Sequence, residues 1–204
     1  EEGVCFPEDS VIYVKNDIMV CIGGNGTLDK PFCHFAAALP SLMPGQKTTI
    51  KVIPGGVASM KPLALVAPGY ILAVVSSNKQ FPTLDGKGNT ESTIEVSMDS
   101  RVYAAKLRLK FSGSASVLQC TNGTLYLDDV KIEGDGINAA KALDAVNCKT
   151  VIQHSQIFKN SAGIQVAGGS ISIENSHIAQ NGSATSAFGA FNVLGGATAR
   201  INYS

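Results

Sequence analysis

Apolar residues recur in this chain at a spacing of roughly 21 to 27 residues, and this repeat constrains the fold more than any other feature of the sequence. The segment Leu143–Asn160 aligns without a gap on Ile164–Asn181. Similar offsets carry the series back from Leu143 to Leu118 and Ile94, and forward from Ile164 to Phe191. A period of this size indicates a repeat architecture in which every repeat packs against its neighbours.

Within each repeat the apolar residues alternate with polar ones, as in Ile171-Ser172-Ile173, which is strand periodicity. The pattern and helix of leucine-rich repeats are absent, and WD40 and kelch repeats are about twice as long. We therefore predict an all-β fold, a right-handed parallel β-helix solenoid of about seven coils with a short N-terminal capping helix. We expect a single domain, with a cap region over residues 1–45 and coils over residues 46–204. Ile50 and Ile71 are predicted to be equivalent positions of the first coils.

Polar residues fill two further positions of the repeat, where the chain must bend between strands. Asn, Asp and His tolerate a left-handed backbone better than other residues with side chains. Stacked polar side chains at such bends can also hydrogen-bond along the solenoid axis. The first series is Asp129, His154 and Asn175, and the second is Asp135, Asn160 and Asn181.

The segment Pro31–Leu42 is predicted to form the capping helix. Proline is favoured at the start of a helix. A cap is needed because the end strands of a solenoid have unpaired backbone groups and an exposed core. The residues expected on its apolar face are Phe32, Phe35, Ala36 and Leu39.

The chain has five cysteines. Cys21 and Cys33 bracket a glycine-rich loop without the C-x-x-C spacing of a zinc site, which favours a disulfide over free thiols and so an oxidising compartment. Cys120 aligns with inward-facing positions and Cys148 with turn glycines, so we do not expect these two to be joined. Cys5 is unassigned. An odd number leaves at least one thiol free or bonded to another chain.

Charge and hydropathy exclude several classes of function. The chain has 16 basic and 16 acidic side chains and no basic stretch typical of nucleic-acid binding. Its longest apolar stretch, Pro62–Ser76, is broken by Pro68 and Gly69 and is too short to span a bilayer, so no transmembrane segment is expected. The chain opens with Glu1 in place of Met, which is consistent with a removed signal peptide, and we expect a secreted or cell-surface protein. The last residues, Arg200–Ser204, stop inside a predicted strand, so we expect the coils to be truncated there.

Three segments carry a family resemblance. They are LYLDDVKIEGDGIN (Leu125–Asn138), VIQHSQIFKNSAGIQVAGG (Val151–Gly169) and SISIENSHIAQNGSATSAFGAFNVLGG (Ser170–Gly196). They resemble the repeats of the pectate-lyase-like superfamily and, more narrowly, predicted bacterial secreted or cell-surface proteins, as does Val20–Gly55. The resemblance implies the solenoid fold. It does not single out an activity, because lyases, hydrolases, esterases, adhesins and stalks share this fold.

The sequence assigns no catalytic residue, metal or cofactor. Lyases of this fold need clustered carboxylates and a basic residue, and its glycoside hydrolases need several close Asp residues. Asp128-Asp129 is the acidic pair within the repeats, and the bend position of Asp129 favours a structural role. The histidines, His34, His154 and His177, form no ligand motif. Calcium is expected only if the protein is a lyase.

One outward column is a candidate ligand-contact ridge. Lys106, Arg108 and Lys110 alternate with leucines that face the core, so the basic side chains point outward. The repeat extends this column across four coils through Arg108, Lys131, Gln156 and His177. It is suited to an acidic polysaccharide, although an ordinary solvated strand face would have the same composition.

We expect a non-enzymatic secreted or cell-surface protein that serves as a structural or adhesive module. The alternative is a polysaccharide lyase, glycoside hydrolase or carbohydrate-binding module that acts along the outer face on polysaccharide or cell-surface glycans. A third interpretation is a fragment whose active coils lie beyond Ser204. The open C-terminal end is predicted to form homo-oligomers through its unpaired strand edges.

Overall fold

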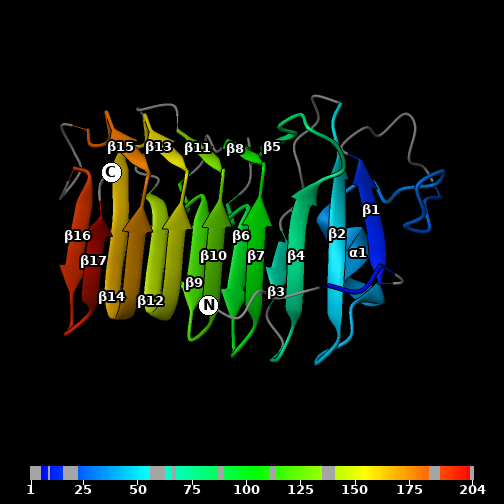
Figure 1. The fold of residues 1–204 in the computed structure, drawn as a ribbon, viewed down its shortest axis with the longest axis horizontal. Helices are drawn as coiled ribbons and strands as arrows, with labels where there is room; N and C mark the ends of the chain where they lie inside the picture. Colours follow the sequence, from blue (N-terminus) through cyan, green and yellow to red (C-terminus); the bar gives the residue numbers. More distant parts are fainter. Residues whose placement is uncertain are drawn as a thin grey trace.

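The protein is a parallel β-solenoid of about five turns, seen here in a computed structural model. The structure describes residues 6–8, 10–15, 23–55, 63–65, 68–86, 90–110, 114–134, 141–183 and 189–202. Strands lie side by side across the long axis, and the chain advances along that axis from β1 at one end to β16 and β17 at the other (Figure 1).

The strands form two sheets. The larger, 12-stranded sheet contains β1 (Val11–Lys15), β2 (Lys47–Ile53), β3 (Leu63–Leu65), β4 (Ile71–Ser76), β6 (Ile94–Ser97), β7 (Arg101–Ala105), β9 (Leu118–Thr121), β10 (Thr124–Asp128), β12 (Lys141–Gln153), β14 (Ala162–Glu174), β16 (Phe191–Leu194) and β17 (Thr198–Asn202). The smaller, five-stranded sheet contains β5 (Thr83–Asp85), β8 (Arg108–Lys110), β11 (Lys131–Glu133), β13 (Gln156–Phe158) and β15 (His177–Ala179).

Each strand pairs in parallel with the equivalent strand of the next coil, in the register that the repeat predicts. Leu143 lies opposite Leu118 on one side and Ile164 on the other. The prediction for the first coils was wrong, because Ile50 pairs with Val74 and not with Ile71. The run that contains Ile71 is apolar throughout, so alternation could not identify which of its residues face the core.

The expected seven coils are too many. The smaller sheet has five strands, one for each complete turn. Within the described residues, the first two turns (β1, then β2) and the last turn (β16 and β17) contribute strands to the larger sheet alone. The apolar repeat therefore counts these partial turns as coils.

The first predicted series of bend residues is confirmed. Asp129, His154 and Asn175 have positive φ angles of 53°, 49° and 47°. An earlier bend, at Asn122 and Asn147, has φ angles of 52° and 51°. Left-handed residues thus turn each coil while its Leu, Ile and Val side chains fill one continuous core.

The second series forms a ladder along the axis. Asn160 is buried, and its side-chain amide donates to Oδ1 of Asn181, 2.9 Å away, and to the carbonyl of Phe158. The Asn181 amide donates in turn to the carbonyl of Ile157. Asp135, the remaining member of this series, lies outside the described residues.

The N-terminal helix is shorter than predicted. It comprises α1 (Phe35–Ala38) and the 3₁₀ turn η1 (Leu39–Ser41), and α1 packs beside β1 and β3. Phe32 bridges to β1 instead, where its N–H donates to the carbonyl of Tyr13. The helix therefore begins after this bridge, with Phe35 and Ala38 buried and Ala36 exposed.

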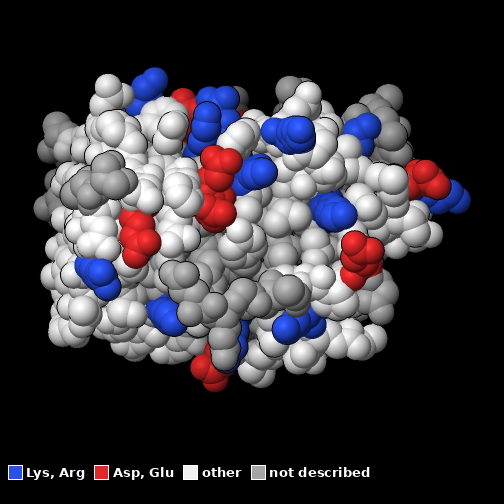
Figure 2. All heavy atoms as spheres, in the orientation of Figure 1, with Lys and Arg blue, Asp and Glu red and all other residues white. Residues whose placement is uncertain are grey.

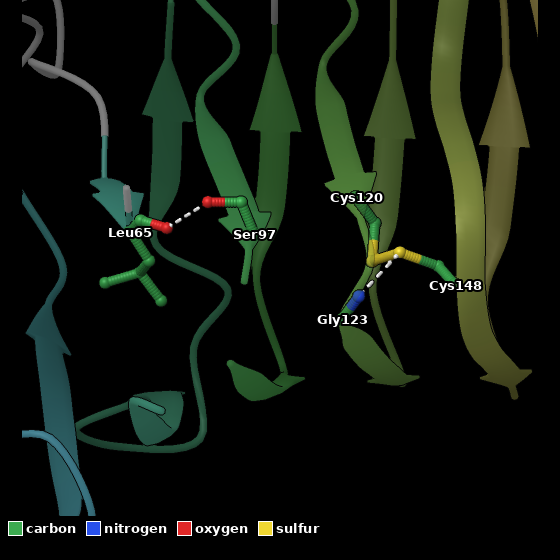
Figure 3. The surroundings of a disulfide bond; sticks show 5 residues. All are labelled: Leu65, Ser97, Cys120, Gly123 and Cys148. Carbon is green, nitrogen blue, oxygen red and sulfur yellow. Dashed lines mark hydrogen bonds between the residues drawn. A yellow bond between two sulfur atoms is a disulfide. The ribbon is translucent and has the colours of Figure 1, made fainter. Parts of the chain in front are cut away.

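A disulfide joins Cys120 to Cys148, contrary to prediction (Figure 3). Cys120 is in the core as expected, but Cys148 is equally buried at the bend within β12, and the two Cα atoms are 6.1 Å apart. The repeat places Cys148 above Gly123, and a Cβ on Gly123 would come within 3.0 Å of its neighbours. Those neighbours are the Ser100 carbonyl oxygen and the Val96 side chain. The Gly123 N–H donates to the Cys148 sulfur at 3.2 Å. The bridge thus crosses diagonally between non-equivalent repeat positions.

The predicted Cys21–Cys33 pair is only partly described. Cys33 is disulfide-bonded, and Cys21 lies outside the described residues, as does Cys5.

The final coil leaves core positions uncovered. Val193 and Ile201 continue the inward columns of Val166 and Ile173, yet they are 40% and 39% exposed. Their neighbour Leu194 is 46% exposed. The described C-terminal end therefore presents an apolar surface between strand edges.

Candidate functional site

The outer surface of four neighbouring strands in the larger sheet forms a candidate binding face, which we call the tyrosine face. Side chains here point away from the core and align in three rows across the strands. The first row is Arg101, Thr124, Lys149 and Ser170; the second is Tyr103, Tyr126, Val151 and Ser172; the third is Ala105, Asp128, Gln153 and Glu174. The face therefore changes from cationic along one edge, through aromatic, to acidic along the other.

Tyr103 and Tyr126 occupy equivalent positions on β7 and β10, so about 4.8 Å separates their backbones. Both side chains are partly exposed. The Lys149 ammonium lies 6.0 Å from the centre of the Tyr126 ring. These two tyrosines form a small aromatic platform on a backbone held by parallel pairing on both sides.

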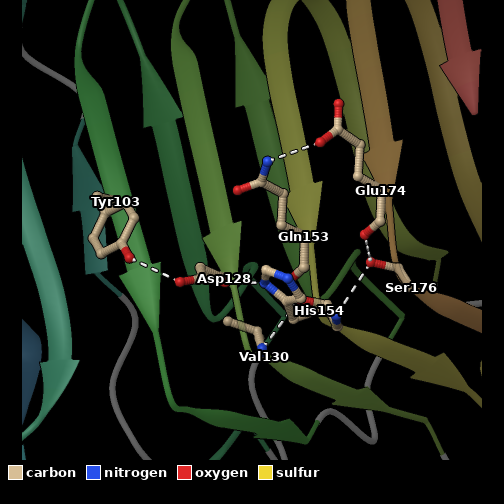
Figure 4. Close-up of polar contacts among 8 residues, drawn as sticks. Tyr103, Asp128, Val130, Gln153, His154, Glu174 and Ser176 are labelled. Carbon is tan, nitrogen blue, oxygen red and sulfur yellow. Dashed lines mark hydrogen bonds and ion pairs between the residues drawn. The ribbon is translucent and has the colours of Figure 1, made fainter. Parts of the chain in front are cut away.

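The acidic edge contains a network of side chains (Figure 4). The Tyr103 hydroxyl donates to Asp128 at 3.2 Å, and His154 Nδ1 lies 2.8 Å from the other Asp128 oxygen. Because a carboxylate only accepts hydrogen bonds, Nδ1 of His154 must carry a proton. On the next strands Gln153 donates to Glu174 at 3.1 Å. These contacts fix the orientation of the polar groups.

Burial raises the pKa of Tyr103 to about 12, and the charge of Asp128 and its hydrogen bond to the phenol add to the effect. Tyr103 therefore stays protonated near neutral pH and serves as a hydrogen-bond donor. Asp128 is engaged on both of its oxygens. These contacts hold the Tyr103, Asp128 and His154 side chains in fixed orientations on the outer face.

A hollow of about 540 Å³ opens at the cationic edge. Its walls come from the bends that begin the four strands and include the buried disulfide cysteine Cys148. The residues that line it are Asp99, Arg101, Asn122, Gly123, Thr124, Asn147, Cys148, Lys149, Gly169 and Ser170.

The predicted ridge forms one column on the smaller sheet. Arg108, Lys131, Gln156 and His177 lie opposite one another on successive strands. Arg108 forms an ion pair with Glu133, and Lys131 lies 5.0 Å over the ring of Phe81. Two of its cations are therefore already engaged within the protein, and ligand contact by this ridge stays a prediction.

The histidines lie apart. His154 is at a bend, His177 is on β15, and His34 precedes α1. Among the described residues, no group of three or more His, Cys, Asp or Glu side chains is placed to hold a metal ion. In the same part of the chain, no helix is long and apolar enough to cross a membrane.

The sequence interpretation missed the tyrosine face, although the repeat contained a signal for it. Tyr103 and Tyr126 are offset by the same number of positions as Arg108 and Lys131, a pair that the repeat had already aligned. Charged side chains on the surface in Figure 2 are scattered among uncharged ones, so charge alone does not mark a site there.

Comparison with known proteins adds no relative. No protein-family model, curated protein or solved structure matches the chain. The chain is an all-β parallel solenoid with one short helix.

Proposed function

We propose that this protein is a non-enzymatic, extracytoplasmic binding module that presents the tyrosine face to a saccharide. One observation carries the proposal: adjacent Tyr103 and Tyr126 are flanked on one side by Arg101, Thr124 and Lys149 and on the other by Asp128 and Gln153. A pyranose ring has an apolar C–H face and a rim of hydroxyl groups. Tyrosine supplies a rigid, amphipathic contact for such a ligand at little cost in conformational entropy.

The state of the polar groups supports binding over catalysis. Tyr103 keeps its proton, and Asp128 accepts hydrogen bonds from Tyr103 and His154. Groups that orient one another in this way can order ligand hydroxyls without exchanging protons with them. A stalk or adhesive module that attaches to glycans would have the same requirements.

The Cys120–Cys148 bridge supports a location outside the cytoplasm, because disulfides persist in oxidising compartments. We also propose that the repeats of this chain are related to those of pectate-lyase-like and bacterial surface proteins. That relationship agrees with a glycan ligand. The enzymatic alternative, a lyase or hydrolase that acts along the outer face, would place its substrate on the same surface.

The chain offers a matched pair of variants for testing this proposal. Tyr126 and Tyr13 are both outward tyrosines of the larger sheet with a lysine ammonium 6.0 Å from the ring, yet Tyr13 lies on β1, away from the tyrosine face. On a panel of immobilised glycans, the protein should bind at least one saccharide. Tyr126→Ala should weaken that binding about tenfold, as expected for loss of an aromatic contact, and Tyr13→Ala should leave it unchanged.

The same panel tests the absence of turnover. Incubation with pectins, alginate, glycosaminoglycans and neutral glycans, with and without calcium, should release no reducing ends and no unsaturated uronate. Product formation would identify an enzyme. If the protein binds no glycan on the panel, or if the two tyrosine variants affect binding equally, the saccharide proposal is wrong.

A further inference from the structure

We infer that the hollow at the cationic edge of the tyrosine face holds an anionic group, a carboxylate or a sulfate ester, on the saccharide unit bound there. This inference rests on the proposed function and deepens it, because it names the ligand as an acidic saccharide. Its evidence lies at the edge of the aromatic platform: two cations that share one hollow, and the polar groups between them.

Arg101 and Lys149 lie at the same position on strands that flank β10, with Thr124 between them. Two strand spacings separate their backbones by roughly 10 Å. Both residues are exposed and both line the hollow. Side chains as long as those of Arg and Lys can therefore reach the same small group above Thr124.

What distinguishes these two cations is that both line the same hollow while neither is paired with a carboxylate of a described residue. Arg108 is paired with Glu133, and Lys141 with Asp144 at 2.6 Å. Within the described part of the chain, Arg101 and Lys149 form no ion pair. Lys149 lies 6.0 Å from the Tyr126 ring, but neither charge is neutralised by a carboxylate that the structure describes. Arg presents a planar set of donors that matches a carboxylate or a sulfate.

The remaining lining indicates what else the ligand carries. Thr124 and Ser170 contribute hydroxyl groups, and Asn147 contributes an amide. Asp99 is the one carboxylate in the described lining, so the hollow carries two positive charges and one negative charge. A carboxylate would repel a bare inorganic anion but accepts a hydrogen bond from a sugar hydroxyl. The set as a whole fits one anionic group attached to a hydroxylated ring.

The test uses the intact chain and four probes: glucuronate, glucose 6-sulfate, glucose and inorganic sulfate. Backbone amide signals would be followed by NMR during titration. Glucuronate or glucose 6-sulfate should shift the amides of Thr124, Lys149 and Ser170, and glucose should bind at least about tenfold more weakly. The two acidic sugars distinguish a carboxylate site from a sulfate site. Added salt should weaken binding of the acidic sugars.

Charge-removing variants complete the test. Arg101→Gln and Lys149→Gln should each raise the Kd of the preferred acidic sugar about tenfold, whereas Lys79→Gln, which removes an exposed charge outside the hollow, should not. Equal affinity for glucose and both acidic sugars, or unchanged affinity in both hollow variants, would overturn the inference. In those cases, saccharide binding that is weakened by Tyr126→Ala would still support the proposed function. Shifts with inorganic sulfate alone would overturn the saccharide assignment of the hollow.

Discussion

Asp128 illustrates how a single residue on the proposed binding face also contributes to the structure of the solenoid. Its carboxylate holds Tyr103 on the preceding coil and His154 on the following one, and so crosses three coils. His154 is itself a left-handed bend residue with a φ angle of 49°. One polar contact therefore couples the turn of the chain to the orientation of the aromatic platform.

The titration of Tyr103 tests this coupling. Its pKa in the folded protein is raised to about 12 from an ordinary 10.0. The free energy of unfolding should therefore include a favourable contribution from Tyr103 below pH 10 that is lost as the pH rises from 10 to 12. Tyrosinate absorbance, or NMR of labelled tyrosine rings, should show this late-titrating ring.

Asp128→Asn separates the causes of the raised pKa. It should lower the pKa of Tyr103 but leave it above 10, because burial, the largest cause, persists. A wild-type Tyr103 that titrates at its ordinary value would contradict the network.

The sequence could predict the backbone at these residues but not their contacts. The residue types of Asp129, His154 and Asn175, together with their shared repeat position, are enough to predict left-handed bends, and all three are observed. The contact of His154 with Asp128 depends on which way two neighbouring side chains turn. Nothing in the repeat specifies that direction.

Between elements, the Cys120–Cys148 bridge fastens β9 to the next coil at the bend within β12. Replacement of both cysteines by alanine should lower the free energy of unfolding by about 3 kcal/mol, because the unfolded chain loses a covalent loop constraint. Urea denaturation would measure the change. With a reductant present in both samples, the wild-type protein should match the variant, whereas an unchanged urea midpoint in the variant without a reductant would contradict this role for the bridge.

The close stacking of coils leads to a second prediction, which compares alanine substitutions at two glycines. A Cβ on Gly163, at the start of β14, would lie 2.0 Å from the backbone oxygen of Ala190, whereas a Cβ on Gly189 would meet only the Asn181 oxygen at an ordinary 3.5 Å. Neither glycine has a positive φ angle. Gly163→Ala should therefore destabilise the protein by about 2 kcal/mol or more, and Gly189→Ala by much less. Equal shifts in their thermal unfolding midpoints would contradict this stacking.

Strands were easier to predict than the elements that join them. The alternation of apolar and polar residues and the offset of the repeat were sufficient to predict the pairing of Leu118, Leu143 and Ile164. The start of the cap helix was missed because Phe32, apolar and at helical spacing, bridges to β1 instead. The Cys120–Cys148 pairing was missed because alignment compares equivalent positions, whereas the bend brings non-equivalent ones together.

At the scale of the whole molecule, the two ends of the solenoid differ. The α1 helix covers one end, and at the other Val193 and Ile201 leave core positions exposed beside strand edges. We expect association between copies through this second end, consistent with the behaviour of uncovered strand edges.

Light scattering over a range of concentrations would measure this association. Val193→Lys should reduce it, because a charge at the contact would be buried there. Val146→Lys, a substitution of a valine 36% exposed in mid-solenoid, should have no effect. A wild-type protein that remains monomeric at high concentration would contradict the expectation.

The diagonal disulfide also has a mechanical consequence. Because the strands lie across the long axis (Figure 1), a pull on the two chain ends should peel coils away in succession, each adding its contour length. Cys120 and Cys148 are 28 residues apart in sequence and covalently joined, so the loop between them cannot extend. In an optical trap the fully stretched chain should be shorter by roughly 90 Å than that of a variant with Cys120→Ala and Cys148→Ala. Under load, the disulfide would therefore limit how far the unfolded solenoid can extend.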